Sequence, residues 1–304
     1  MAADSPVMIL LVGMTGAGKT TFASLASGRA DLEIGTGLDP CTQDPCAVEF
    51  KLRNRTVILI DTPGFDDDAR SDVEILESIA KWMVKQGYSK QQPLDGLILL
   101  HPIFAANGLD SGTERKRTRI LQKILGEDAY RRVVIATTMW GVLNDEEDAQ
   151  RDIHARWTRG GVWDEFRRGG STMVRHYNTK ESTDRILQSI IDRSDEAGRT
   201  QSQIQRDLAK KNVRFRDTAI GEELSDQLDE EICLIQNQLL EHRRERPPDS
   251  WRKSRNRAQR EMWKEWDDEY SDLVKSLQAR QAASKKMNSY LVSVFFIILP
   301  TLHI

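Results

Sequence analysis

The fold is decided by the stretch Val7-Met8-Ile9-Leu10-Leu11-Val12 and by the residues that follow it directly, Gly13-Met14-Thr15-Gly16-Ala17-Gly18-Lys19-Thr20. A continuous apolar run of this length is typical of a strand that is buried on both faces. The second stretch has the form Gly-x-x-x-x-Gly-Lys-Thr, and Lys19–Gly28 is expected to form a helix. A strand, this loop and a helix in that order predict a phosphate-binding loop.

The chemistry of the loop follows from its residue types. Glycines let the backbone turn its N–H groups inward, and the start of the helix adds further donors for phosphate oxygens. We expect Lys19 to neutralise the β- and γ-phosphates and Thr20 to coordinate Mg²⁺. The alternative is a chance glycine-rich loop, which the strand and helix on either side argue against. The candidate nucleotide-binding residues here are Gly13, Thr15, Gly16, Ala17, Gly18, Lys19, Thr20 and Thr21.

A second motif, Asp61-Thr62-Pro63-Gly64, ends a predicted hairpin of the strands Ala47–Leu52 and Thr56–Asp61. An aspartate at the carboxyl end of a buried strand lies where parallel sheets bind their ligands. Asp61 is therefore expected to hold Mg²⁺, mostly through water, and the Gly64 N–H to meet the γ-phosphate. Asp-x-x-Gly is a weak signal alone. Its order after the phosphate loop and the hairpin is the stronger argument.

The segment between the two motifs is expected to supply a threonine that senses the γ-phosphate. Thr36 and Thr42 are the candidates, and Thr42 is preferred because it lies closer to the hairpin. The predicted metal ligands are therefore Thr20, Thr42 and Asp61. The alternative for Thr42 is an ordinary polar loop residue, because threonine is common in loops.

Apolar runs alternate with amphipathic helices as far as about Ser194. The hairpin is followed by a helix over Asp72–Gln86, strands at Gly96–Leu100, Val133–Thr137 and Thr172–Arg175, and helices at Thr113–Leu125, Glu146–Arg168 and Ser182–Ile191. This alternation predicts an α/β fold of three layers, in which helices cover both faces of a mostly parallel sheet with one antiparallel hairpin strand. The predicted domain covers residues 1–195.

The composition changes after Gly198. Residues 196–246 are expected to form a helical segment with a stripe of apolar residues spaced as in a coiled coil, namely Leu224, Leu228, Ile232, Ile235 and Leu239. Pro247-Pro248 ends that helix. Residues 247–304 form a basic helical tail, with Met262, Trp266, Leu273 and Leu277 on one side of its helix. The tail ends in the short apolar run Tyr290–Ile304, which is below the length of a spanning helix, so a weak membrane contact and simple packing both stay open.

Overall composition limits the class of partner and the compartment. The chain has 304 residues and a net charge of −3, which argues against a general nucleic-acid binder. Its three cysteines, Cys41, Cys46 and Cys233, have no framework spacing. A sparse, odd set of this kind fits a reducing compartment, so we expect a cytoplasmic protein, with membrane association through the C-terminus as an open addition.

These motifs resemble those of the septin-like, immunity-associated GTPases, and most closely those of fungal proteins described as G-domain-containing. Five segments carry the resemblance, namely Gly13–Thr20, Leu38–Thr42, Asp61–Asp67, Thr137–Trp140 and Arg175–Ser182. The resemblance covers roughly the first 195 residues. It implies a G domain, GTP or GDP with Mg²⁺ as ligands, slow turnover, and regulation by a homodimer through the G domain or by a membrane.

Two departures from the wider GTPase pattern matter. Small GTPases place a glutamine after the Asp-x-x-Gly glycine to orient water, and here Phe65 stands there. In addition, Thr137-Thr138-Met139-Trp140 stands where a base-reading motif with an aspartate is expected. Thr138 and Trp140 are candidate base contacts, although Trp140 is equally suited to packing. The stretch Asn178–Ser182 is suited either to backing the base or to capping a helix through Ser182.

The sequence thus predicts a GTP-binding switch or assembly module with slow Mg²⁺-dependent hydrolysis. Two alternatives stay open. Phe65 motivates a nucleotide-loaded scaffold with negligible turnover, and the missing aspartate motivates a P-loop ATPase.

Overall fold

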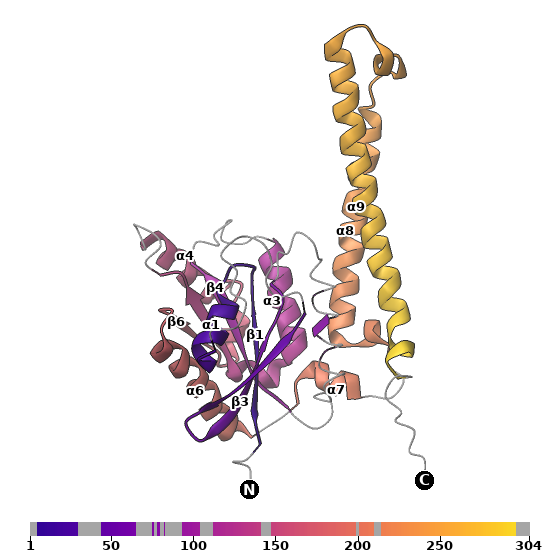
Figure 1. Ribbon diagram of the computed structural model, residues 1–304. Helices are drawn as coiled ribbons and strands as arrows, with labels where there is room; N and C mark the ends of the chain where they lie inside the picture. Colours follow the sequence, from indigo (N-terminus) through magenta and orange to yellow (C-terminus); the bar gives the residue numbers. More distant parts are fainter. Residues whose placement is uncertain are drawn as a thin grey trace. The chain divides into compact units, whose positions relative to one another are not determined.

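Figure 1 shows the computed structural model of the protein. The described residues are 5–29, 44–64, 75, 78–79, 82, 93–103, 112–140, 147–198, 201–209 and 214–295. They belong to two compact units, Met1–Lys211 and Asn212–Ile304. Thr36, Thr42, Phe65 and most of the helix predicted over residues 72–86 lie outside the described residues. Within that stretch, Ile75 and Ile79 are helical and buried.

The first unit is built on a six-stranded sheet in the order β2-β3-β1-β4-β5-β6. All neighbouring strands are parallel except β2 and β3, which form the antiparallel hairpin. The predicted three-layer α/β fold with one antiparallel strand is therefore confirmed. The strands are β1 Val7–Gly13, β2 Cys46–Leu52, β3 Arg55–Asp61, β4 Leu94–Pro102, β5 Val133–Thr138 and β6 Thr172–Arg175.

Helices cover the two faces of this sheet (Figure 1). They are α1 Lys19–Ser27, α3 Gly112–Leu125, α4 Glu147–Trp157, α5 Asp164–Arg168, α6 Lys180–Ala197 and α7 Gln203–Ala209, with a short 3-10 helix η1 at Glu127–Arg132. Alternate residues of β1, such as Ile9 and Leu11, share one core with Phe22 of α1 and Leu187 of α6. All of β1 is buried, so both faces of this strand are covered, as its apolar run predicted.

One helix prediction was wrong. The stretch Glu146–Arg168 is not a single helix, because α4 ends at Trp157 and α5 starts at Asp164. The cause is the pair Gly160-Gly161. Gly160 has a positive φ of 83°, and a Cβ on Gly161 would lie 2.3 Å from the Ala155 carbonyl oxygen. The chain folds back tightly on the end of α4 there, which only glycine permits.

The first unit continues past the predicted boundary at residue 195. Ser194 donates its hydroxyl to Asp95 Oδ1 (2.9 Å), while Asp95 Oδ2 accepts the Met8 N–H (2.8 Å). Further on, Gln205 Oε1 accepts the N–H of Leu94 (2.9 Å) and both donors of Ser202. Ser202, Ile204 and Gln205 are at most 1% exposed. This segment closes the amino ends of β1 and β4, and for that reason the compact unit reaches Lys211.

The second unit is a helical hairpin. Its elements are η2 Phe215–Asp217, α8 Ala219–Arg244, η3 Asp249–Lys253 and α9 Arg257–Phe295. The long helices α8 and α9 run side by side in opposite directions (Figure 1). The predicted stripe of α8 is confirmed at Leu224, Leu228, Ile235 and Leu239, which are buried, while Ile232 is half-buried.

The predicted stripe of α9 needs one correction. Met262 is 53% exposed, and Trp263 is buried in its place at 8% exposure. The exchange follows from Trp263 being the larger apolar side chain, whose burial removes more surface from water. Among the helices in the described part of the chain, none is long and apolar enough to cross a membrane.

The segment after Ser194 generates a stability prediction. A chain that ends at Lys211 should keep the melting temperature of the first unit, whereas a chain that ends at Ser194 should melt roughly 5–10 °C lower. The shorter chain loses the burial of Ile204, worth about 2 kcal/mol, and leaves the buried Leu94 N–H without its acceptor. Thermal unfolding followed by circular dichroism measures the difference. Equal melting temperatures would mean that the segment is not part of this core.

Candidate functional site

The carboxyl ends of the parallel strands lie along one edge of the sheet, and the central strand β1 meets that edge at Gly13. In the register of the sheet, Leu11 is paired with Asp61 of β3, and Gly13 with Leu100 of β4. A Cβ on Gly13 would lie only 2.5 Å from the Leu100 carbonyl oxygen. Only a residue without a side chain therefore allows β1 to run on into the loop beside β4.

The loop from Gly13 to Gly18 wraps around the amino group of Lys19. Lys19 Nζ donates to the carbonyl oxygens of Gly13 (3.0 Å) and Met14 (2.8 Å). Gly18 immediately precedes α1 and has a φ of 92°, in the left-handed region that favours glycine. The first N–H groups of α1 consequently face the same hollow of the loop, as in an anion-binding helix start.

Burial lowers the pKa of Lys19 to about 8, and the nearby carboxylate of Asp61 opposes that shift. Lys19 is only 7% exposed. A buried ammonium group held by two carbonyl oxygens lacks a full countercharge, and an anion placed against it would favour its charged form. A polyphosphate fits this requirement.

The Asp-x-x-Gly segment lies directly against the loop. Thr20 Oγ1 donates to Asp61 Oδ2 (3.0 Å), so the two predicted metal ligands of the described residues are adjacent. Thr62 donates its hydroxyl to the Leu11 carbonyl oxygen (2.8 Å) and is fully buried. A Cβ on Gly64 would lie 2.6 Å from the Thr15 backbone nitrogen. Hydroxyl and carboxylate oxygens at this spacing form a donor set that suits Mg²⁺.

The end of β5 is also tied to the loop. Thr138 Oγ1 donates to the Ala17 carbonyl oxygen (3.2 Å), and Met139 next to it has a positive φ of 66°. The Trp140 side chain instead contacts Thr137 of β5 and Arg175 of β6. Its indole N–H donates to both the carbonyl and the hydroxyl oxygen of Thr137 (3.0 Å each), and the Arg175 guanidinium carbon lies 3.9 Å from the ring centroid.

The turn after β6 is held by side chains that the sequence interpretation did not single out. His176 shares a hydrogen bond of 2.7 Å with Ser182 Oγ, and burial lowers its pKa to about 4, so its ring is neutral. Its ring also packs on Phe22 of α1 at 5.1 Å. The helix cap is Thr179, whose hydroxyl accepts the Ser182 N–H, and not Ser182 as the capping alternative supposed.

The structure therefore brings most of the predicted site residues together. The phosphate loop with Lys19 and Thr20, the Asp61–Gly64 segment and Thr138 meet at the carboxyl edge, and Thr21 lies in the first turn of α1. Trp140 lies beside them with its indole facing β6, and Thr42 is outside the described residues. Thr62 and His176 were missed, because no motif marks a buried hydroxyl or ring that ties one loop to another.

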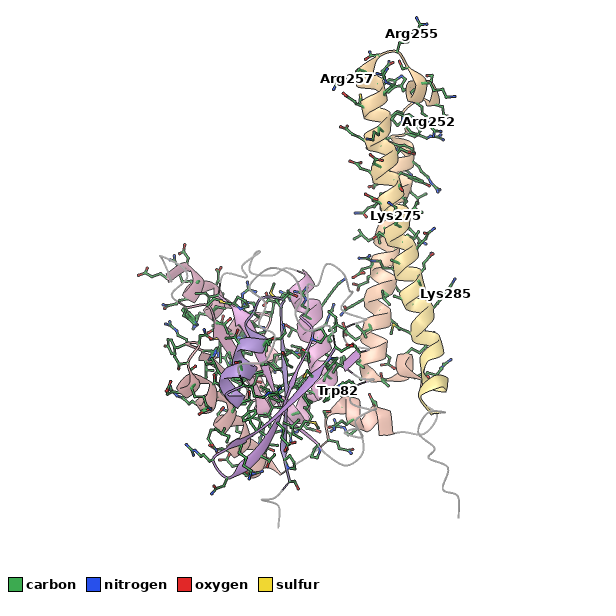
Figure 2. All side chains as sticks on the ribbon, in the orientation of Figure 1. Trp82, Arg252, Arg255, Arg257, Lys275 and Lys285 are labelled. Atoms are coloured by element: carbon green, nitrogen blue, oxygen red, sulfur yellow. The ribbon has the colours of Figure 1, made fainter. Side chains whose placement is uncertain are left out.

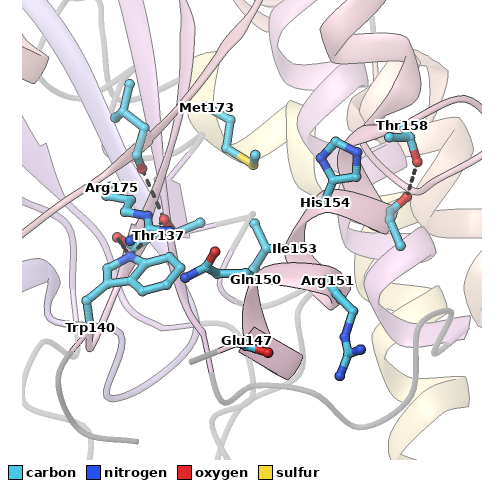
Figure 3. A pocket seen from close by; sticks show the side chains of 12 residues that line it. Thr137, Trp140, Glu147, Gln150, Arg151, Ile153, His154, Thr158, Met173 and Arg175 are labelled. Atoms are coloured by element: carbon cyan, nitrogen blue, oxygen red, sulfur yellow. Dashed lines mark hydrogen bonds between the residues drawn. The ribbon is translucent and has the colours of Figure 1, made fainter. Parts of the chain in front are cut away.

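A second hollow lies on the side of Trp140 that faces α4 (Figure 3). It measures about 860 Å³ and is lined by residues of β5, β6 and α4, among them Thr137, Arg175, Met173, Gln150 and His154. None of the phosphate-loop residues lines it. We therefore place the candidate phosphate site at the loop and not in this hollow.

Residues 8–138 match the family model described as 50S ribosome-binding GTPase. This range starts in β1 and ends at Thr138, so it contains the phosphate loop, the hairpin and the Asp61–Gly64 segment. The first unit therefore has the fold of a P-loop G domain. No curated protein sequence matches the chain.

Solved structures of similar fold include GTPases from several systems. Toc33 from Arabidopsis thaliana, in a dimerization-deficient form, is 13% identical with a TM-score of 0.47, over 64% of this chain and 86% of that chain. Era in complex with MgGDPNP and a 16S ribosomal RNA fragment is 14% identical with a TM-score of 0.44, over 62% and 57% of the two chains. The G domain of the FeoB iron transporter from T. maritima is 13% identical with a TM-score of 0.35, over 62% and 98%.

The contact between Gly64 and the phosphate loop generates a prediction. Gly64→Ala should weaken binding of a GTP analogue with Mg²⁺ by at least about tenfold, since its methyl group would overlap Thr15 and push the loop out of shape. Titration with a fluorescent analogue measures the affinity. Gly112→Ala is the control, because nothing lies within 4 Å of a Cβ there. If both variants bind as the wild type does, the two segments move independently of each other.

Proposed function

We propose that the G domain binds GTP and GDP with Mg²⁺ and hydrolyses GTP slowly, as a nucleotide-dependent switch or assembly module. The observation that carries this proposal is the junction of two motifs at one edge of the sheet. The ammonium group of Lys19 is enclosed by its own loop, and the Thr20 hydroxyl lies 3.0 Å from the Asp61 carboxylate.

Each residue has a defined part in this proposal. Lys19 and the N–H groups of Gly16 and Gly18 bind phosphate oxygens, and Thr20 with Asp61 holds the metal. Mg²⁺, when bound, neutralises charge that develops on the phosphates. The Gly64 N–H is placed to meet the γ-phosphate, because Gly64 lies against Thr15 of the loop. Thr42 remains the proposed third metal ligand on sequence grounds.

The first functional prediction concerns Lys19. Lys19→Ala should reduce affinity for a non-hydrolysable GTP analogue at least about a hundredfold, because charge-assisted hydrogen bonds worth about 1.5–3 kcal/mol each are lost. Calorimetric titration measures it, and circular dichroism checks that the domain is still folded. Lys51→Ala removes an exposed lysine of β2 and should bind normally. Unchanged affinity of the Lys19 variant would refute the phosphate-loop assignment.

Hydrolysis is proposed to need a group from outside the isolated subunit. Phe65 stands where small GTPases carry the glutamine that orients the attacking water, and a phenyl ring cannot orient water. A homodimer formed through the G domain is the proposed source of the missing group, in line with the septin-like, immunity-associated subgroup that the motifs resemble. Slow turnover by the separate subunit follows from this proposal.

The second functional prediction is that turnover depends on protein concentration. Dilute protein should hydrolyse GTP at an intrinsic rate on the order of 10⁻⁴ per second, and the activity per subunit should rise as the concentration increases. Phosphate release over a hundredfold range of protein concentration measures both. The Lys19→Ala variant gives the background. A fast rate that is independent of concentration would argue against the dimer, and no turnover at any concentration would favour the nucleotide-loaded scaffold.

Base recognition is proposed to rest on backbone contacts near Thr138 and the turn after β6, with one face of the Trp140 ring left for stacking. The indole N–H of Trp140 is already used by Thr137, and Arg175 covers one face of its ring. Thr138 uses its hydroxyl on the Ala17 carbonyl oxygen. Since no carboxylate occurs in Thr137-Thr138-Met139-Trp140, the strongest usual contact to guanine is missing from this stretch.

The third functional prediction is a moderate preference for guanine. Sites that leave polar groups unpaired with the wrong ligand discriminate by about 10⁴–10⁵-fold, and we expect GTP over ATP to fall well below that range. Displacement of a fluorescent GTP analogue by unlabelled GTP and ATP measures the ratio. Equal displacement would favour the P-loop ATPase alternative. Full selectivity would point to a base-reading residue beyond Trp140, where Asp145 and Glu146 follow in the sequence.

The cell compartment and the tail complete the proposal. Sparse cysteines favour the cytoplasm. The apolar run Tyr290–Ile304 is proposed to make at most a weak membrane contact, and the stripe of α8 is proposed to act as a coiled-coil element.

A further inference from the structure

Positive charge is concentrated where α8 leads into α9. We call residues Arg243–Arg260 the basic tip. It carries eight cations, namely Arg243, Arg244, Arg246, Arg252, Lys253, Arg255, Arg257 and Arg260, and two anions, Glu245 and Asp249. The tip thus has a net charge of +6, and since the whole chain has −3, the other residues together carry −9. Figure 2 shows Arg252, Arg255 and Arg257 projecting from this end of the hairpin.

Part of this charge has no acidic partner among the residues that the structure describes. Arg246 and Arg257 pair with Asp249 (2.5 Å) and Glu261 (2.7 Å). By contrast, no carboxylate among the described residues lies within ion-pair distance of four exposed side chains of the tip, which are Arg244, Arg252, Lys253 and Arg255. Like charges this close repel each other, and an anion bound at the tip would relieve this repulsion.

Aromatic rings beneath the tip hold its guanidinium groups in place. The rings of His242 and Trp266 are stacked at 5.2 Å, and each side chain bonds to the other residue's carbonyl oxygen at 2.9 Å. Arg252 lies over the ring of Trp263 at 4.8 Å and Arg246 over Trp266 at 5.7 Å. A guanidinium group that rests on a ring keeps its plane while its N–H groups remain available for phosphate oxygens.

We propose that the basic tip binds the phosphate and carboxylate headgroups of an anionic membrane surface. Its cations lie at the end of α8, in η3 and around the start of α9, so they meet at one end of the helical hairpin. A group of cations at one end of a hairpin can contact many headgroups of a flat membrane surface at once. A nucleic acid fits less well, because binding of single strands uses aromatic faces for base stacking, and here Trp266 stacks on His242 and Tyr270. Basic clusters of this size are attracted to acidic bilayers. None of the residues of the basic tip belongs to the candidate nucleotide site.

The experiment is flotation of the full-length protein with lipid vesicles. One set contains phosphatidylcholine alone, and the other contains about 30% phosphatidylserine, which gives a negative surface potential. The wild type should float with the anionic vesicles only, and added salt should release it. The tip variant Arg252→Gln, Lys253→Gln, Arg255→Gln should lose at least about tenfold in partitioning, because each cation near such a surface contributes to the attraction.

A matched control changes the net charge by the same amount at other places. It carries Lys51→Gln, Lys123→Gln and Lys275→Gln, three exposed lysines outside the tip, and should float within about twofold of the wild type. An equal loss of flotation in both variants would mean that binding depends on the net charge of the protein and not on the position of the cations, and it would overturn the proposal. Circular dichroism shows whether each variant is folded, and the salt dependence of the wild type tests the proposal without any substitution.

Two further outcomes would also overturn it. Flotation with neutral vesicles that disappears in a chain ending at Asn288 would assign the contact to the apolar run Tyr290–Ile304. Binding of a DNA duplex or an RNA strand that needs Arg252, Lys253 and Arg255, with no flotation on anionic vesicles, would make the tip a nucleic-acid site.

Discussion

Strand β1 has to leave the middle of the sheet between two parallel neighbours, and the rest of the site depends on how it does so. The Leu100 carbonyl oxygen of β4 occupies the space that a side chain at Gly13 would need. Past that point the loop closes on Lys19, whose ammonium group bonds to the carbonyl oxygens of Gly13 and Met14. The helix α1 therefore starts at a fixed place, with its N–H groups directed at the hollow. The shape of the candidate phosphate loop thus follows from the packing of one strand end.

Small hydroxyl side chains join the neighbouring segments to this loop. Thr20 bonds to Asp61, Thr62 bonds to the carbonyl oxygen of Leu11, and Thr138 bonds to that of Ala17. Each of the two bonds to carbonyl oxygens has a net worth of about 1 kcal/mol, and a bond to a charged group such as the Asp61 carboxylate is worth about 1.5–3 kcal/mol. Together they connect the ends of β3 and β5 to β1. The position of both strand ends is thus linked to the shape of the loop.

The two units differ in the chemistry they can offer. The G domain holds its functional groups in a buried edge, where Lys19 and Asp61 are each less than 10% exposed. The basic tip instead displays arginine side chains to solvent on a scaffold of stacked rings. Buried groups at the carboxyl edge of the sheet suit a small ligand that makes close contacts. The exposed cations of the basic tip suit an extended anionic surface, and their attraction to it weakens as salt is added.

The sequence by itself determined the sheet class, the phosphate loop, the Asp-x-x-Gly segment and the apolar stripe of α8, because each depends on local periodicity or on spacing within a few residues. It could not find Thr62 or His176, whose partners lie on other elements. It also missed the break at Gly160-Gly161 and the exchange of Met262 for Trp263, since both depend on what packs alongside. Trp140 makes the difference plainest. From the sequence, a tryptophan beside a predicted base site is suited to stacking on the base. In the folded chain its indole N–H bonds to Thr137 and its ring packs against Arg175. These contacts form because β5 and β6, which are separate in the sequence, are neighbours in the sheet.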